Sequence, residues 1–200
     1  MINSKVDHCK TLEEFYFEIR KQQTDAHGEH YCNQHDAISK YMKECTSYKE
    51  LGTHQGGTAA AACLTNPKSV NLIDISMEKY NQSKHLFEKY CTENNIDLVV
   101  LEMESTNPKG VSECDLLLID SRHEPNHLKK ELDCHAKKVN KYMIFHDTSI
   151  INGRQNESLY HVLEDFTGKN TVWKIIERDQ RSVGYTVLLK EQNKMEGIKL

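Results

Sequence analysis

The chain has 200 residues, of which 38% are hydrophobic and 28% are charged, and its formal net charge is −4. This composition is typical of a globular protein and excludes a disordered one, and the length fits one domain with a substantial core. The sequence has neither a basic run of the nucleic-acid-binding type nor an apolar run of membrane-spanning length, so we expect neither kind of partner.

The first 46 residues predict two helices joined by a polar segment. Thr11 and Glu14 form a capping box at the start of the first helix. Apolar residues at helical spacing follow in both helices: Leu12, Phe15 and Ile19, then Ile38, Tyr41, Met42 and Cys45. The segment 23–35 between them could bind zinc or form a loop that covers an active site. Its candidate ligands, His27, His30, Cys32 and His35, match no standard zinc spacing, so we favour the cover.

The stretch Tyr48–Ala62 combines a short apolar entry, a glycine turn and an alanine-rich segment. This order predicts a strand, a tight loop and the start of a helix with free N–H groups in its first turn. Gly52 permits the sharp turn, and Gly56 and Gly57 permit close approach of a ligand or of neighbouring backbone.

Three nucleotide-binding patterns compete for this turn, and a purely structural turn is a fourth alternative. A dinucleotide fingerprint needs glycine at position 54, where histidine stands, and a P-loop needs lysine directly after Gly57, where Thr58 stands. The third pattern is an acidic residue, any residue, glycine, three residues and glycine, which Glu50, Gly52 and Gly56 satisfy. It resembles motif I of class I S-adenosylmethionine-dependent methyltransferases. The resemblance implies that the acidic residue and the loop, which here contains Thr53, hold the methionine end of the cofactor.

Strands and helices alternate in the rest of the chain. The expected strands are 70–76, 98–103, 115–120, 142–146, 172–177 and 185–189, and the expected helices are 78–95, 125–140 and 158–166. This alternation predicts a parallel sheet covered by helices on both faces. The turn between the last two strands is too short for a helical crossover, so these strands should be antiparallel.

Acidic or imidazole side chains follow five of the strands, at the edge where ligands bind in open α/β sheets. They are Glu50, then Asp74, then Glu104 with Ser105, then Asp120 with His123, then His146 with Asp147. Asp74 comes one strand–helix–strand unit after the glycine turn, so it could accept hydrogen bonds from two ribose hydroxyls, or it could cap the next helix. Glu104 and Ser105 would then lie beside the adenine.

Asp120 and Asp147 should end neighbouring strands, roughly 4.8 Å apart, where two carboxylates can share one cation. Oxygen ligands favour Mg²⁺, whereas ligation by His146 would favour Mn²⁺, Fe²⁺ or another transition ion. The alternative is that each aspartate caps a helix.

Several motifs together resemble the cephalosporin hydroxylase-like branch of class I methyltransferases, near the catechol-type small-molecule O-methyltransferases. They span residues 35–190 and comprise Glu50–Thr53 with Gly56-Gly57, Ile119–Glu124, His127-Leu128, Glu131-Leu132, Phe145–Thr148 and Gly184–Leu188. The resemblance implies a Rossmann-like doubly wound seven-strand sheet with its last strand reversed, and a metal held by Asp120, residue 146 and Asp147. We expect helices and an active-site cover in 1–46, the methyltransferase core in 47–190 and a polar tail in 191–200.

Two positions depart from these relatives. The branch usually has an acidic residue at position 146, which leaves the identity of the metal open. The catechol-type enzymes have a catalytic lysine three residues after the metal aspartate, where His123 stands, so His123 is a candidate general base, with a helix cap or a metal ligand as alternatives.

The sequence therefore predicts an S-adenosylmethionine-dependent O-methyltransferase for a small hydroxylated acceptor, a sugar or a phenolic compound, with a divalent metal and with Asp120 and His123 in catalysis. The alternatives are a metal-dependent hydroxylase-type enzyme, a non-catalytic cofactor-binding accessory protein and a nicotinamide enzyme, which His54 disfavours. Seven cysteines without a C-x-x-C pair, and an N-terminus unlike a signal peptide, favour a cytoplasmic protein with reduced thiols. Homo-oligomerisation stays open.

Overall fold

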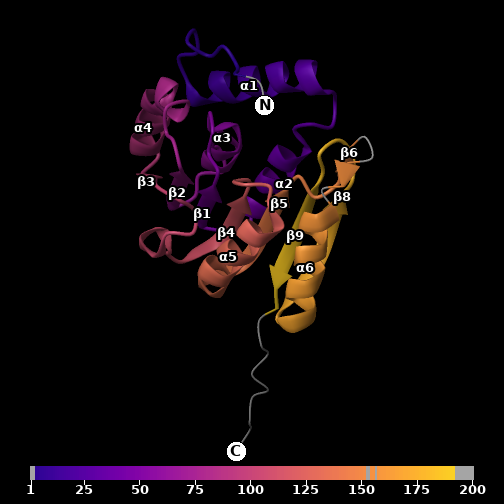
Figure 1. Ribbon diagram of the computed structural model, residues 1–200. Coiled ribbons are helices and arrows are strands. Elements are labelled where there is room, and N and C mark those ends of the chain that lie inside the picture. The colour runs from indigo at the N-terminus through magenta and orange to yellow at the C-terminus, as the bar shows by residue number, and fades with distance from the viewer. Residues whose placement is uncertain (1–2, 152–153, 156, 192–200) are drawn as a thin grey trace, which may run out of the picture.

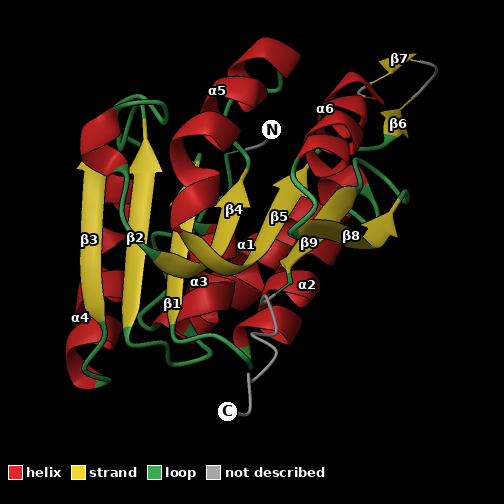
Figure 2. Cartoon of the chain, turned by 90° about the horizontal axis from the view of Figure 1, so that it is seen from below, coloured by secondary structure: helices red, strands yellow, loops and turns green. Residues whose placement is uncertain are grey.

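The structure, a computed structural model, describes residues 3–151, 154–155 and 157–191, and its side-chain description leaves out residues 150–158. A seven-stranded sheet with the order β3-β2-β1-β4-β5-β9-β8 forms its centre (Figures 1 and 2). The strands are β1 Ser47–Leu51, β2 Ser69–Asp74, β3 Asp97–Glu102, β4 Cys114–Ile119, β5 Val139–His146, β8 Trp173–Asp179 and β9 Tyr185–Lys190. A separate antiparallel pair joins β6 Ile150–Ile151 to β7 Arg154–Gln155.

The first five strands of the sheet are parallel, and β9 is antiparallel to both β5 and β8. This arrangement confirms the predicted seven-strand, mostly parallel sheet with its last strand reversed. Its consequence for the site is that the carboxyl ends of β1, β2, β3, β4 and β5 all meet at one edge.

Helices cover both faces of the sheet (Figure 2). Their bounds are α1 Leu12–His27, α2 Asn33–Met42, α3 Gly57–Cys63, α4 Lys84–Glu93, α5 Pro125–His135 and α6 Glu157–Lys169. The first four pack into one apolar core, and α5 and α6 pack into a second one on the opposite face. The apolar run of β4 supplies both cores in alternation, Leu116 and Leu118 to the first, Leu117 and Ile119 to the second, as expected for a strand buried on both faces.

Three predicted elements differ from the structure. The helix expected over 78–95 is broken into the 3-10 turn Tyr80–Gln82 and α4, because the buried Ser83 hydroxyl bonds the carbonyls of Gln55 and Tyr80 at the break. The helix expected over 125–140 ends at His135, and β5 already begins at Val139, where it pairs with β4. The polar loop of 23–35 shrinks to residues 28–32, because α1 continues until Gly28 adopts a φ of +99° and ends it.

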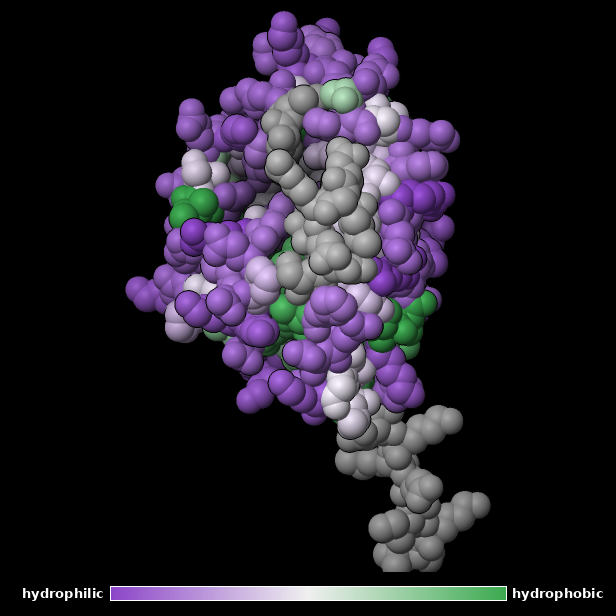
Figure 3. All heavy atoms as spheres, turned by 45° about the vertical axis from the view of Figure 1, so that its right-hand side comes forward, coloured by the Kyte–Doolittle hydropathy of each residue, from purple (hydrophilic) through white to green (hydrophobic). Residues whose placement is uncertain are grey.

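The surface is mostly hydrophilic in the view of Figure 3. The large apolar side chains that the described residues expose are Phe17, Ile75, Val99 and Ile176. None of the described helices is long and apolar enough to span a membrane. One of the four exposed residues, Ile75, belongs to a cavity at the carboxyl edge of the sheet.

Candidate functional site

The glycine turn after β1 lies directly against the end of β4. Gly52 has a φ of +93°, and a side chain there would overlap the carbonyl group of Asp120. A Cβ at Gly56 would lie 2.9 Å from the ring of Phe87, and one at Gly57 would lie 3.2 Å from His35. These glycines therefore accommodate protein neighbours, whereas the sequence left open a close approach by a ligand. The turn holds Asp120 in place at the site.

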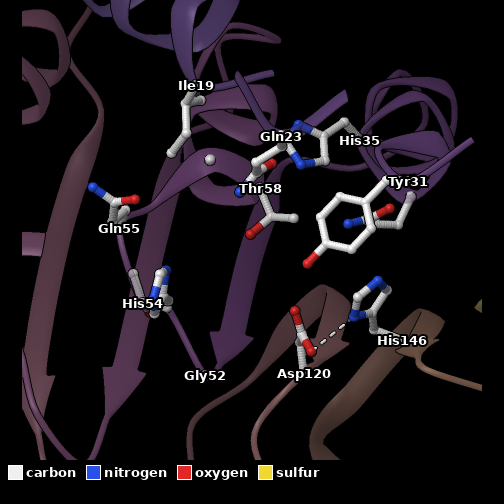
Figure 4. A pocket seen from close by; sticks show the side chains of 13 residues that line it. Ile19, Gln23, Tyr31, His35, Gly52, His54, Gln55, Thr58, Asp120 and His146 are labelled. Atoms are coloured by element: carbon white, nitrogen blue, oxygen red, sulfur yellow. Dashed lines mark hydrogen bonds and ion pairs between the residues drawn. The ribbon is translucent and has the colours of Figure 1, made fainter. Parts of the chain in front are cut away.

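Two adjoining cavities open along this edge. The larger has a volume of about 470 Å³, within the usual range for small-molecule sites. The smaller has a volume of about 30 Å³ and lies between the glycine turn and the α1–α2 segment (Figure 4). Both cavities are lined by Gly52, His54 and Asp120, so they adjoin at these residues.

The larger cavity contains the residues predicted to bind a nucleoside. Asp74 lies in its wall, where Oδ2 accepts a hydrogen bond from the His54 N–H at 2.8 Å and Oδ1 accepts one from the Ser76 N–H at 3.1 Å. Asp74 thus ties β2 to the glycine turn and caps no described helix. Glu104 and Ser105 line the same cavity, with Glu104 exposed and Ser105 buried.

Six residues of this cavity were not among the predicted binding residues: His54, Ile73, Ile75, Ser121, Arg122 and His127. His127 follows Pro125 in the first turn of α5, and its Nε2 lies 2.9 Å from the Ser105 hydroxyl. The buried carboxylate of Glu131 accepts a hydrogen bond from the Ser121 hydroxyl at 2.5 Å. His127 belongs to the motif His127-Leu128 of the family resemblance, and that motif was the signal that could have revealed it.

Glu50, predicted to contact the cofactor, lines neither cavity and is fully buried beneath the turn. The Tyr48 hydroxyl donates a hydrogen bond to one of its carboxylate oxygens. Burial raises the pKa of Glu50 to about 8, although the bond from Tyr48 lowers it in part. The structure therefore corrects the predicted contact of Glu50 with a ligand: the Glu50 carboxyl is buried below the loop and lines neither cavity. Gly56 also lies outside both cavity walls, whereas Thr53 and Gly57 line the smaller one.

A compact cluster of carboxylates and imidazoles occupies the ends of β4 and β5. Within the described chain it is the group of side chains suited to a metal ion, and its ligand atoms lie within 4.8 Å of one another: Asp120, His123, His146 and Asp147. Asp120 and Asp147 thus lie close together, as predicted, and both side chains are 11% exposed. His27, His30, Cys32 and His35 form no such cluster, which contradicts the zinc alternative.

His123 bridges the two aspartates. Its Nε2 lies 3.1 Å from Oδ1 of Asp120, and its Nδ1 lies 2.6 Å from Oδ2 of Asp147. Burial would lower the pKa of His123, but these two hydrogen bonds outweigh it and raise the pKa to about 10. In this arrangement His123 is an imidazolium at neutral pH, and it carries a positive charge between the two carboxylates.

His146 lies on the inner side of the cluster, 4% exposed, with Nδ1 2.9 Å from Oδ1 of Asp120. Burial would lower its pKa, but the charge of Asp120 and this hydrogen bond raise it. Conversely, burial would raise the pKa of Asp120, but the charge of His146 and the bonds from both imidazoles hold it well below its usual range. Asp120 and the two imidazoles therefore stabilise each other's charged forms.

The α1–α2 segment covers the smaller cavity, as expected of residues 23–35. Tyr31 lies over the cluster, with its ring centroid 6.4 Å from that of His146, and Figure 4 shows its hydroxyl directed between Thr58 and Asp120. Gln23, Gln34 and His35 contribute further walls. The sequence indicated a cover but did not show which of its side chains face inward. The backbone pair of β6 and β7 follows β5. From its sequence, the segment 150–157 is a further candidate for shaping an acceptor pocket, and its side chains lie outside the described ones.

No protein-family model matches the chain, and no curated protein matches its sequence. Solved structures do match. A candidate caffeoyl-CoA O-methyltransferase from Staphylococcus aureus aligns over 91% of this chain and 93% of its own, with 12% identity and a TM-score of 0.65. TomG, an O-methyltransferase from Streptomyces achromogenes in complex with S-adenosylmethionine, aligns over 94% and 92%, with 10% identity and a TM-score of 0.64. An O-methyltransferase from Bacillus cereus in complex with S-adenosylhomocysteine aligns over 90% of each chain, with 12% identity and a TM-score of 0.63.

These likenesses confirm the predicted fold. The chain has the Rossmann-like fold of class I methyltransferases, and the three structures that it resembles are described as O-methyltransferases.

Proposed function

We propose that this protein is an S-adenosylmethionine-dependent O-methyltransferase that acts on a small hydroxylated acceptor, a sugar or a phenolic compound, with the help of a divalent metal. One observation carries the proposal: a nucleoside-sized cavity and a cluster of metal-binding side chains share Asp120 as a common wall. A methyl donor and an acceptor oxygen held on a metal would therefore lie next to each other. The likeness to cofactor-bound O-methyltransferases supports this choice.

The larger cavity fits an adenosine group in size and in chemistry. Ile73 and Ile75 are apolar parts of its wall, and Ile75 is 66% exposed, which leaves an apolar surface free to cover a flat base. Asp74 retains acceptor capacity for ribose hydroxyls, because each carboxylate oxygen can accept more than one hydrogen bond. When bound, the cofactor supplies an activated methyl group, and the protein has to align the acceptor oxygen with it.

The cluster on β4 and β5 fits a divalent cation. Asp120 and Asp147 supply hard oxygen ligands suited to Mg²⁺, whereas His146 and His123 favour Mn²⁺ or Fe²⁺. A bound cation would orient the acceptor and lower the pKa of its hydroxyl. The contacts of His123 with Oδ1 of Asp120 and Oδ2 of Asp147 support this proposal, because both carboxylates face a common position between them.

His123 is the candidate proton acceptor of the site. As a base it must be neutral at Nε2 or Nδ1, and both nitrogens bond carboxylates here. Release from Asp120 or Asp147 would lower the pKa of His123 toward its ordinary range and free one nitrogen for the acceptor hydroxyl. The role of His123 as a base therefore depends on a rearrangement of this cluster.

A second function, a hydroxylase-type enzyme, is favoured by one feature. Two imidazoles beside carboxylates are the ligand type of non-haem iron oxygenases, and His123 and His146 provide two imidazoles here. Consumption of oxygen with bound iron would support this alternative.

Native mass spectrometry of the purified protein, combined with metal analysis, tests the proposal. The expected result is a bound adenosyl compound and one divalent ion per chain, followed by transfer of a labelled methyl group from S-adenosylmethionine to a phenolic or sugar acceptor. Preferential binding of NAD would contradict the proposal. Turnover that persists after full chelation would contradict the part of the proposal that concerns the metal.

A further inference from the structure

The carboxyl edge of the sheet continues beyond the metal cluster to β8. Because β9 is antiparallel to both β5 and β8, the strands β5 and β8 run in the same direction and end at the same edge. The larger cavity lies at the ends of β1 to β4, and the cluster lies at the ends of β4 and β5. The side of the cluster away from the larger cavity therefore faces β8, which is two strands, or roughly 10 Å, from β5.

Arg178, next to the last residue of β8, extends across this gap toward β5. Its Nη2 donates a hydrogen bond to the carbonyl oxygen of Thr148, the residue after Asp147, at 3.4 Å. Its guanidinium carbon lies 3.4 Å from the centre of the Tyr160 ring, near the start of α6. Stacking on an aromatic ring fixes the plane of a guanidinium and leaves its N–H edges available for hydrogen bonds. Arg178 thus places a positive charge beside the outer side of the cluster.

This charge has no carboxylate partner among the described residues. A guanidinium has five N–H donors, and the contact with Thr148 uses one of them. The buried Nε of Arg178 has no hydrogen-bond partner in the described part of the chain. The other described arginine side chains do form ion pairs, Arg20 with Asp36, Arg122 with Glu124 and Arg181 with Asp179. Arg178 therefore has unused donors and an unpaired charge that an anionic ligand can satisfy.

The chemistry of a guanidinium favours a carboxylate as this anion. A carboxylate can accept two parallel hydrogen bonds from the planar guanidinium, and its single negative charge balances that of one arginine. A phosphate carries up to two negative charges, and Asp120 and Asp147 are close to this position. A hydroxyl group held at the cluster and a carboxylate held at Arg178 would be separated by the gap from β5 to β8, which one aromatic or sugar ring can span.

We propose that Arg178 binds a carboxylate group of the acceptor, so that the acceptor is a hydroxylated carboxylic acid, either a phenolic acid or a sugar acid. The inference rests on the proposed function and narrows its acceptor class. It also extends the site along the sheet edge to β8, the sixth strand that ends there.

Two matched pairs of acceptors test the proposal. Protocatechuate and protocatechuyl alcohol share a catechol ring, and glucuronate and glucose share a sugar ring, but only the first member of each pair has a carboxylate. Their affinities are measured by calorimetry with protein saturated with S-adenosylhomocysteine and Mg²⁺, and methyl transfer is measured with labelled S-adenosylmethionine. We expect the unaltered protein to bind the acid of one pair at least about tenfold more tightly than the neutral compound.

Variants of β8 assign this preference to Arg178. Arg178→Gln should weaken binding of the acid by about tenfold to a hundredfold and leave binding of the neutral compound unchanged. Arg178→Lys keeps the charge without the planar fork, so it should retain only part of the preference. Lys174→Gln is the matched control, because it removes a positive charge from the same strand, where Lys174 pairs with Glu191, and it should retain the full preference.

The outcomes separate this inference from the proposed function. If none of the four compounds is bound or methylated, the proposed function fails, and the inference fails with it. If a compound is methylated but neither acid is preferred, or if Arg178→Gln keeps the full preference, the inference fails alone. The preference is a ratio within one variant, so partial unfolding affects both members of a pair alike. If Arg178→Gln does not fold, Arg178→Lys decides, since an undiminished preference in that variant would contradict recognition by the guanidinium fork.

Discussion

The buried carboxyl group of Glu50, beneath the glycine turn, should make the stability of the protein depend on pH. Its pKa of about 8 lies above the ordinary 4.5, so the folded protein holds this proton more tightly than the unfolded chain does. A raised acid pKa gives stability that is fully present below the unfolded pKa and is lost as the pH rises through the folded pKa. The loss should therefore extend over the range between these two values.

The magnitude follows from the two pKa values. Ionisation of Glu50 makes an unfavourable contribution to the free energy of folding. This contribution rises from about 1 kcal/mol at about pH 5 to about 5 kcal/mol at about pH 9. Glu50→Gln removes the titration and keeps the size of the side chain. The variant should thus gain about 4 kcal/mol relative to the unaltered protein over this range, or about 8–16 °C in melting temperature for a chain of this length.

Urea unfolding of both proteins from about pH 5 to about pH 9 measures this difference, and the other titrating groups cancel because they are common to both. Tyr48→Phe is the second arm. It removes the hydroxyl that stabilises the ionised carboxylate, so it should steepen the loss of stability with pH, but only while Glu50 is present. Parallel pH curves for the unaltered protein and Glu50→Gln would contradict a raised pKa of Glu50 in the folded protein.

Four further predictions concern ligands and catalysis. Asp74→Ala should weaken binding of S-adenosylhomocysteine at least about tenfold, because it removes a charged acceptor for two hydroxyls, and unchanged calorimetric affinity would exclude Asp74 from the site. Asp147→Asn should lose the metal but keep cofactor affinity, since Asp147 lines neither cavity. Metal affinity of the unaltered protein, measured by competition with a chelator, should rise with pH because a proton on His123 must be displaced, and a flat profile would contradict this competition. His123→Gln should lower kcat at unchanged metal content and abolish the rise of rate with pH, whereas loss of the metal would identify His123 as a ligand.

The arrangement of the sheet could be predicted from local sequence patterns. The apolar run Leu116–Ile119 indicated a strand buried on both faces, and the alternation of strands and helices indicated parallel pairing. Parallel strands bring their carboxyl ends to one edge, so the approach of Asp120 to Asp147 followed from their positions after β4 and β5. The presence of Asp74 and Glu104 at one cavity has the same origin.

The sequence did not show what each strand-end group would contact across the fold. Glu50 shares a strand face with Tyr48 at a spacing of two, and this face turns toward the core under α3, so its carboxyl lies below the loop. The glycines of the turn left open a close approach by a ligand or by neighbouring backbone, and in the fold Asp120, Phe87 and His35 lie where their side chains would be.

Local patterns in the chain define the strands and the kinds of polar group at their carboxyl ends, because hydrophobic periodicity and turn residues act over a few neighbours. The protonation of these groups and their access to the cavities depend on contacts between elements that are distant in the chain. His123 became a charged bridge because two strands brought carboxylates to both of its nitrogens. His35 lies 17 residues before Gly52 in the chain, and both line the smaller cavity because α2 packs on α3. Burial and electrostatic fields depend on all surrounding elements at once, and no local pattern encodes them.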